Sequence, residues 1–217
     1  GQIEPRILAA VSNDEALAAA TWDDDMYAPV AARLGVTRDV AKVAVLGAMY
    51  GQTTGHGAVA LRGLESAYPI AMTYLTTAAR SAEGGSDLRT RGGRLVRMSS
   101  NEPDPEPGDA AHRAARSRAA ARGRYGRNAM VQGAAAEFFK TWAAIVRARC
   151  TPIDARIVLC LHDELLVHCR ADRAEVATRI VADGVQEASQ RWSGGATSTA
   201  VRFVADTSVV TRWSDAK

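Results

Sequence analysis

The sequence predicts an α+β fold in which long helices surround a small antiparallel sheet. Apolar residues recur at helical spacing over most of the chain. One apolar run, RIVLCLHDELLVHC at residues 156–169, is interrupted by polar residues at its centre and predicts two strands joined by a turn. No segment is repeated. The 217 residues, 47% of them hydrophobic, suffice for one domain with a substantial core, or slightly more than one.

The first residues are expected to form a strand end followed by short helices. Gln2 and Ile3 resemble the end of a strand that leads into a helix. Asn13 or Asp14 is a candidate cap for the next helical segment. An acidic run at residues 23–25 then precedes an apolar helix that a glycine ends.

A helix over residues 37–50 carries the most informative pattern of the chain. Thr37 is a suitable N-cap, and Gly51 would end the helix. Four side chains recur every four residues and share one face: Arg38, Lys42, Leu46 and Tyr50. This stripe would be roughly 18 Å long, with cations at one end and an aromatic ring at the other. It fits a nucleoside triphosphate lying along the helix, and the alternative is an amphipathic helix whose cations are solvated.

The middle of the chain mixes helix, hairpin and loop. Residues 58–82 have helical spacing with a junction at Tyr68-Pro69, and the paired glycines within 84–98 predict a short strand or hairpin. Residues 99–110 contain three prolines and four acids and are expected to form an exposed loop.

A long helix is expected from about residue 110 to Arg149, and its first part is rich in arginine. Within it Arg124, Asn128 and Gln132 share a face, either as a binding surface or as an ordinary solvated face. A helix over residues 173–192 and a last strand at 201–205 are expected to follow.

The polar triplet His162-Asp163-Glu164 interrupts the apolar run at its centre. It could be a hairpin turn whose acids face water. The sharper hypothesis is a magnesium (Mg²⁺) site, because paired carboxylates on a rigid turn suit a hard cation that is also bound by substrate phosphates. A histidine-aspartate phosphohydrolase site is disfavoured, since the other three histidines lack the spacing it needs.

Composition adds few constraints. The net charge of +3 does not by itself require a nucleic-acid partner. Three cysteines without a CxxC motif indicate a reducing compartment, which favours a cytoplasmic location. No apolar stretch approaches the roughly 20 residues of a membrane span, so no membrane association is expected.

Taken together, these motifs resemble those of family A DNA polymerases, the polymerase I type. The stripe from Arg38 to Gly51 resembles their motif B, and GQIEPRILA at residues 1–9 resembles motif A from its third residue onward. LHDELLV at 161–167 resembles motif C, and RNAMVQGAAAEFFK at 127–140 resembles the segment that leads from fingers back to palm. The likeness covers nearly the whole chain in the family's order.

The resemblance implies a role for each motif residue. Residues implied to bind the incoming dNTP are Arg38, Lys42, Leu46, Tyr50, Glu4 and Tyr27, with Lys42 also catalytic and Glu4 as the steric gate against a ribose 2′-OH. Residues implied to contact primer-template DNA are His162, Arg124, Asn128, Gln132 and Gly51. Asp163 and Glu164 would be the catalytic carboxylates and metal ligands.

The resemblance also implies a division of the chain. Residues 1–12 would be a palm strand and the start of the following helix, 13–125 the fingers, and 126–217 the C-terminal palm. The family's other metal-binding Asp would lie two positions before Gly1, and the thumb and the rest of the palm would also be upstream, with a preceding exonuclease domain left open.

Three positions depart from the family pattern. Leu46 stands where Phe or Tyr is usual, Tyr27 where a triphosphate-contacting His is usual, and Pro5 where an aliphatic residue is favoured. These departures indicate a divergent polymerase, expected to carry out template-directed addition of dNTP to a primer 3′-OH by two-metal phosphoryl transfer. Because the family's other metal-binding Asp would lie upstream of Gly1, we expect this chain to be a fragment that is inactive alone. The alternative is a non-catalytic primer-template-binding module that keeps the fingers fold.

Overall fold

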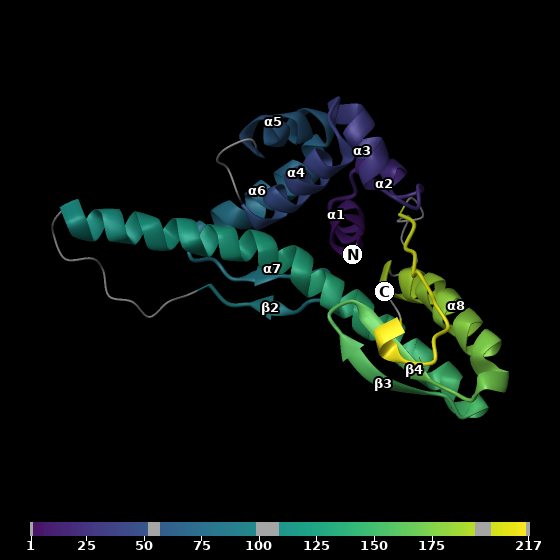
Figure 1. Cartoon of the computed structure of the whole chain (residues 1–217). Helices are drawn as coiled ribbons and strands as arrows, with labels where there is room; N and C mark the ends of the chain where they lie inside the picture. The colour runs from purple at the N-terminus through teal and green to yellow at the C-terminus, as the bar shows by residue number, and fades with distance from the viewer. Residues whose placement is uncertain (1, 52–56, 99–108, 194–200, 216–217) are drawn as a thin grey trace.

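The computed structural model describes residues 2–51, 57–98, 109–193 and 201–215. A long central helix crosses the molecule, with a group of shorter helices on one side and a hairpin with another helix at the far end (Figure 1). The shorter helices are α1 (Ile3–Ser12), α2 (Glu15–Ala20), α3 (Tyr27–Leu34), α4 (Arg38–Tyr50), α5 (Gly57–Ala67) and α6 (Pro69–Glu83). The long helices are α7 (Asp109–Cys150) and α8 (Ala174–Ser193).

The predicted helix ends are largely confirmed. The Thr37 side chain accepts a hydrogen bond from the backbone N–H of Val40, and Gly51 ends α4 in the left-handed region at φ 73°. Asp14 caps α2, and its two carboxylate oxygens accept from the N–H groups of Leu17 and Ala71, each at 3.0 Å. This buried carboxylate therefore joins α2 to α6 without an unsatisfied oxygen.

Helix α7 organises the fold. Its 42 residues extend about 63 Å at 1.5 Å per residue. Glycines lie on α7 where other elements approach its backbone closely. A Cβ atom added at Gly126 would lie 2.4 Å from the Cβ of Ala82. A Cβ atom added at Gly133 would lie 2.6 Å from the methyl carbon of Thr90. The missing side chains let α6 and the first hairpin pack directly on the α7 backbone.

Each of the two hairpins is a separate two-stranded antiparallel sheet. The first comprises β1 (Leu88–Arg89) and β2 (Leu95–Val96), and the second comprises β3 (Arg156–Leu161) and β4 (Glu164–His168). The second hairpin pairs Leu161 with Glu164, so the turn residues are His162 and Asp163. The expected α+β architecture, with the polar triplet on a hairpin, is thus confirmed.

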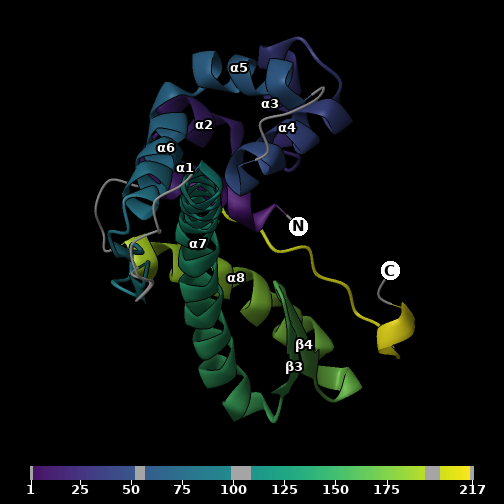
Figure 2. The same ribbon diagram turned by 90° about the vertical axis from the view of Figure 1, so that its left-hand side faces the viewer.

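One continuous core joins α1–α6 to α7 and α8. At its C-terminal end Phe138 of α7 stacks on Phe203 with ring centroids 4.2 Å apart, and Trp192 of α8 meets both rings edge-on. These contacts hold the segment that starts at residue 201 between the two long helices. Figure 2, turned by 90°, shows α1–α6 together above and α8 with β3 and β4 below.

Two expected strands are wrong. Ile3 already belongs to α1, so residues 2 and 3 do not form a strand end. Residues 201–205 lie outside any sheet, because their polar backbone groups bond elsewhere: the N–H of Arg202 donates to Thr21 Oγ1 at 2.9 Å, and Gln186 donates to the carbonyl of Phe203 at 2.8 Å.

Other expectations are not settled by the structure. Most of the loop predicted at 99–110 lies outside the described residues. The proposed boundary between residues 125 and 126 falls inside α7, and the division into fingers and palm stays a prediction. In the described ranges, no helix has both the length and the apolar character required to cross a bilayer.

Candidate active site

The α4 stripe lies on the solvent face of its helix. The opposite face is buried through Ala41, Ala44, Val45, Ala48 and Met49, at the i, i+3, i+4 spacing that fixes the helix against the core. Arg38, Lys42 and Tyr50 are exposed and Leu46 is half-buried. The structure therefore presents the four predicted nucleotide-binding side chains on one accessible face.

Arg38 is held in place at the first turn of α4. Its Nε donates to a carboxylate oxygen of Asp25, its guanidinium lies 5.7 Å from the ring centroid of Tyr27, and Asp39 is 3.6 Å from Nη1. The other oxygen of Asp25 accepts from the backbone N–H of Tyr27 at 3.2 Å. The Arg38 hydrogen bond holds the pKa of the Asp25 carboxyl below its usual range and raises that of Arg38. Sequence reasoning noted this acidic run but missed the pairing.

Tyr27 is buried, although the resemblance placed it among the residues that contact the triphosphate. Its ring is 1% exposed, and burial raises its pKa to about 12. Its hydroxyl has no hydrogen-bond partner in the described part of the chain. A residue this buried offers almost no surface to a triphosphate in this structure, where its ring lies beside the Arg38 guanidinium.

Glu4, Tyr50 and Gln132 form a hydrogen-bonded triad that joins α1, α4 and α7. The Tyr50 hydroxyl donates to Glu4 Oε2 at 3.2 Å, and the Gln132 amide donates both to Glu4 Oε1 and, at 3.3 Å, to the Tyr50 oxygen. Glu4 is only 9% exposed, and both its oxygens are used. Partial burial and the charge of Glu4 raise the pKa of Tyr50.

The end of α4 also touches the predicted DNA-contacting face of α7. A Cβ at Gly51 would lie 3.0 Å from Cγ of Arg124, so the arginine stem covers the glycine. Arg124 is exposed and lies about two turns before Gln132, while Asn128 is half-buried and lies about one turn before it on the same face. Two predicted DNA-contacting positions from different motifs, Gly51 and Arg124, are thus in contact.

Arg6 is a residue whose importance the sequence did not reveal. Its guanidinium is almost fully buried and donates to the carbonyls of Asp23 and Asp24 at 2.9 and 3.1 Å, and to those of Thr21 and Arg202. Burial lowers its pKa. Arg6 thereby fastens α1 to the turn before α3 and to the last segment of the chain, which fixes Glu4 and Asp25 relative to each other.

The polar triplet lies at the tip of the second hairpin. His162 adopts the left-handed region at φ 52°, which costs a non-glycine residue roughly 1 kcal/mol. This backbone places its Nδ1 3.2 Å from Asp163 Oδ1, and the Asp163 side chain is 26% exposed. Glu164 is exposed beside it. Within the described ranges, the tip shares no hydrogen bond with α1, α4 or α7.

A metal ion would find two carboxylates at this tip, which is the hard-oxygen donor type that Mg²⁺ prefers. Nowhere in the described ranges do three or more His, Cys, Asp or Glu side chains gather in a metal-binding arrangement. Asp163 and Glu164 therefore have the donor type of part of a cation site, and the described residues contain no complete one.

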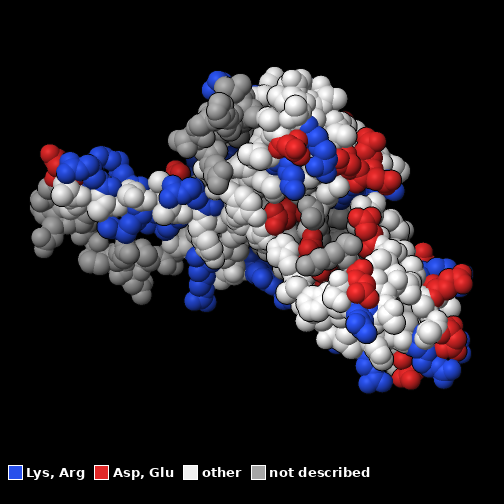
Figure 3. All heavy atoms as spheres, in the orientation of Figure 1, with Lys and Arg blue, Asp and Glu red and all other residues white. Residues whose placement is uncertain are grey.

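Cations dominate the projecting part of α7. Gly123 lies against Glu83 at the end of α6, and the residues before it extend beyond that helix. Arg113, Arg116 and Arg118 are exposed on this part, and Figure 3 shows the blue side chains spread along it. Such a surface matches a polyanion in charge.

The fold is that of a polymerase domain. The structure superposes on the "POL domain of Pol1 from M. smegmatis complex with DNA primer-template and dNTP" with a TM-score of 0.68, at 23% identity over 87% of this chain and 35% of that one. DNA polymerase theta of Caenorhabditis elegans is 25% identical over 86% of this chain and 12% of its own length.

The model of DNA polymerase family A matches residues 1–215. The chain therefore belongs to DNA polymerase family A. It spans about an eighth of the curated relative and about a third of the solved domain.

Proposed function

We propose that this chain forms the fingers and C-terminal palm of a DNA polymerase that adds deoxynucleotides to a primer 3′-OH on a template. The observation that carries the proposal is the Glu4–Tyr50–Gln132 triad. It joins one residue from each of three motifs at the place where a nucleotide sugar, a nascent base pair and a primer-template would meet.

The nucleotide would lie along the exposed face of α4. Arg38 and Lys42 supply cations for the triphosphate, Leu46 lies against the sugar, and Tyr50 against the base. Glu4 crowds the position of a ribose 2′-OH, and the two hydrogen bonds it accepts keep its carboxylate from turning away. This rigidity favours a deoxyribose over a ribose.

The DNA would follow the α7 face that continues from this site. Gly51 abuts the template, Arg124, Asn128 and Gln132 contact the primer-template, and His162 contacts the primer terminus. The contacts are cations and amides that touch backbone and sugar groups, so they suit an enzyme that copies any sequence.

The chemistry is phosphoryl transfer, in which the protein mainly positions groups and neutralises charge. Asp163 and Glu164 would hold Mg²⁺, which when bound assists the attacking oxygen and the leaving pyrophosphate. The rest of the polymerase would supply further ligands, the thumb and the rest of the palm. Because the described residues contain no complete cation site, we expect no primer extension by the 217-residue chain alone.

Nucleotide binding tests the proposal. Calorimetry of the purified chain with Mg²⁺-dNTP should show binding that Lys42→Ala weakens roughly tenfold or more, because a hydrogen-bonded charge is lost. Lys140→Ala, which removes an exposed lysine from α7, is the matched control and should leave binding unchanged. Primer-template binding without any Mg²⁺-dependent dNTP binding would instead support the non-catalytic DNA-binding module, and efficient primer extension would refute the expected inactivity.

A further inference from the structure

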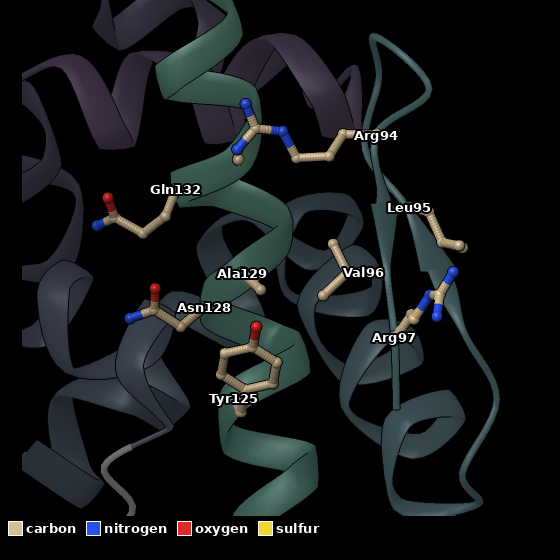
Figure 4. A pocket seen from close by; sticks show the side chains of 9 residues that line it. Arg94, Leu95, Val96, Arg97, Tyr125, Asn128, Ala129 and Gln132 are labelled. Atoms are coloured by element: carbon tan, nitrogen blue, oxygen red, sulfur yellow. The ribbon is translucent and has the colours of Figure 1, made fainter. Parts of the chain in front are cut away.

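A groove lies between the first hairpin and α7. Its volume is about 740 Å³, within the range of small-ligand sites. Val96, Ala129 and Gly133 are apolar residues among those that line it. Arg94 and Tyr125 lie at its two ends (Figure 4). The groove thus combines apolar surface with a cation and an aromatic ring.

The hairpin that forms one wall is firmly attached to α7. Glu137 of α7 accepts from the Thr90 hydroxyl and, at 2.8 Å, from the backbone N–H of Gly92. Arg91 donates to the carbonyl of Ser193 at 3.0 Å and lies over the ring of Trp192. The groove is therefore built before any ligand arrives, which lowers the entropic cost of binding.

Tyr125 is the unusual feature of the groove. Its side chain is 58% exposed, although neighbouring Gly126 and Arg127 are buried. In Figure 4 its ring extends along α7 toward Ala129, while Arg94 reaches from the hairpin across the helix toward Gln132. An exposed ring and a cation along one groove are features that proteins use to hold unpaired nucleotides, with a base on the ring and a phosphate of the strand on the cation.

The positive charge of the groove favours a negatively charged ligand such as a nucleic-acid strand. Arg94 and Arg97 are both exposed, and none of its described lining residues is Asp or Glu. Asn128 and Gln132 belong both to this groove and to the proposed primer-template face, so a strand that leaves that face can enter the groove. Inside a duplex both faces of a paired base are covered by stacking, so a ring in the side of the groove is reached most readily by an unpaired base.

We propose that the groove holds unpaired nucleotides of the template strand, with a base stacked on Tyr125 and a phosphate bound by Arg94. The inference rests on the proposed function, because it requires that the chain bind primer-template DNA. It adds a site for the single-stranded part of that DNA, with Tyr125 as its specific determinant.

Fluorescence anisotropy with the full 217-residue chain tests this with two DNAs. One is a blunt duplex, and the other is the same duplex with a 5′ single-stranded extension of about six nucleotides, a length typical of one single-strand site. The extension should tighten binding by roughly fivefold or more, as expected for one stacked base. Tyr125→Ala should abolish this gain without weakening blunt-duplex binding, and Tyr125→Phe should keep it.

The proposed phosphate contact of Arg94 is tested in the same anisotropy assay. Arg94→Gln should reduce the gain from the extension, whereas Arg179→Gln, which removes an exposed arginine from α8, should not. Thermal melting of each variant checks that it is folded. An equal gain with Tyr125→Ala, or a loss of the gain with Tyr125→Phe, overturns the groove proposal alone. Failure to bind either DNA overturns both this proposal and the primer-template binding on which it rests.

Discussion

Tyr50 donates its hydroxyl hydrogen to Glu4 across 3.2 Å and so ties the last turn of α4 to the first turn of α1. The two residues are 46 positions apart in the chain. Gln132 of α7 completes the group, and each of the three residues is hydrogen-bonded to the other two. Changes at this point are therefore expected to affect both stability and nucleotide selection.

Replacing Glu4 by Ala should lower the free energy of unfolding by about 1–3 kcal/mol, because Tyr50 and Gln132 lose the acceptor they share in a partly buried place. Chemical denaturation measures this. Glu175→Ala on the surface of α8 is the control and should change stability little. The same Glu4 variant should also bind Mg²⁺-dNTP and Mg²⁺-rNTP with more equal affinity. A variant that stays as stable and as selective as the parent would contradict the role of the triad.

Asp25 should position Arg38 for the triphosphate. It engages Nε, so the terminal nitrogens of the guanidinium, part of its five-donor fork, remain available to a phosphate. Asp25→Asn should weaken Mg²⁺-dNTP binding roughly twofold to tenfold through lost immobilisation of that side chain. Asp39→Asn removes the other nearby carboxylate, which is highly exposed, and should have little effect. Tighter binding by Asp25→Asn would show that this acid competes with the nucleotide instead.

Alanine substitutions at Gly51 and Gly35 distinguish the effect of backbone strain from the effect of contact with Arg124. Both are left-handed, at φ 73° and 65°, but only at Gly51 would a Cβ meet another side chain, that of Arg124. Each Gly→Ala change should cost about 1–2 kcal/mol of stability through the backbone. Only Gly51→Ala should also weaken primer-template binding, because it displaces Arg124. Equal DNA affinities of the two variants would argue against Arg124 as a DNA contact.

The raised pKa values of two tyrosine phenols, Tyr27 and Tyr74, predict that the folded chain loses stability at alkaline pH. Burial raises the pKa of both Tyr27 and Tyr74 from 10 to about 12. The folded state favours the neutral phenols, so their contribution is fully present below pH 10 and is lost as the pH rises through about 12.

Chemical denaturation measured across this pH range should show a fall in the free energy of unfolding. Tyr27→Phe should make that fall smaller. At neutral pH the same change should not destabilise the chain, because the Tyr27 hydroxyl has no partner among the described residues. Tyr125→Phe, which alters an exposed ring, is the control. An unchanged pH profile in Tyr27→Phe would contradict the assignment.

Much of the local structure could be predicted from short-range patterns. Thr37 and Gly51 mark the ends of α4, and the interrupted apolar run gives the β3–β4 hairpin. These signals act within one or two turns, where backbone geometry and side-chain spacing dominate. The predicted strand at residues 201–205 failed because a strand needs a neighbour, and the hydrogen-bond partners of this segment are helices and a turn.

The sequence by itself determined the helices, the hairpins, the stripe on α4 and membership of family A. Only the tertiary structure decided which of these features meet: Gln132 reaches Glu4 across 128 positions, and Arg6 reaches Arg202 across 196. It also revealed the Asp25–Arg38 pair, the buried place of Tyr27 and the groove at Tyr125. The physical reason is that side-chain spacing fixes the face of a helix, whereas packing around α7 fixes which faces touch.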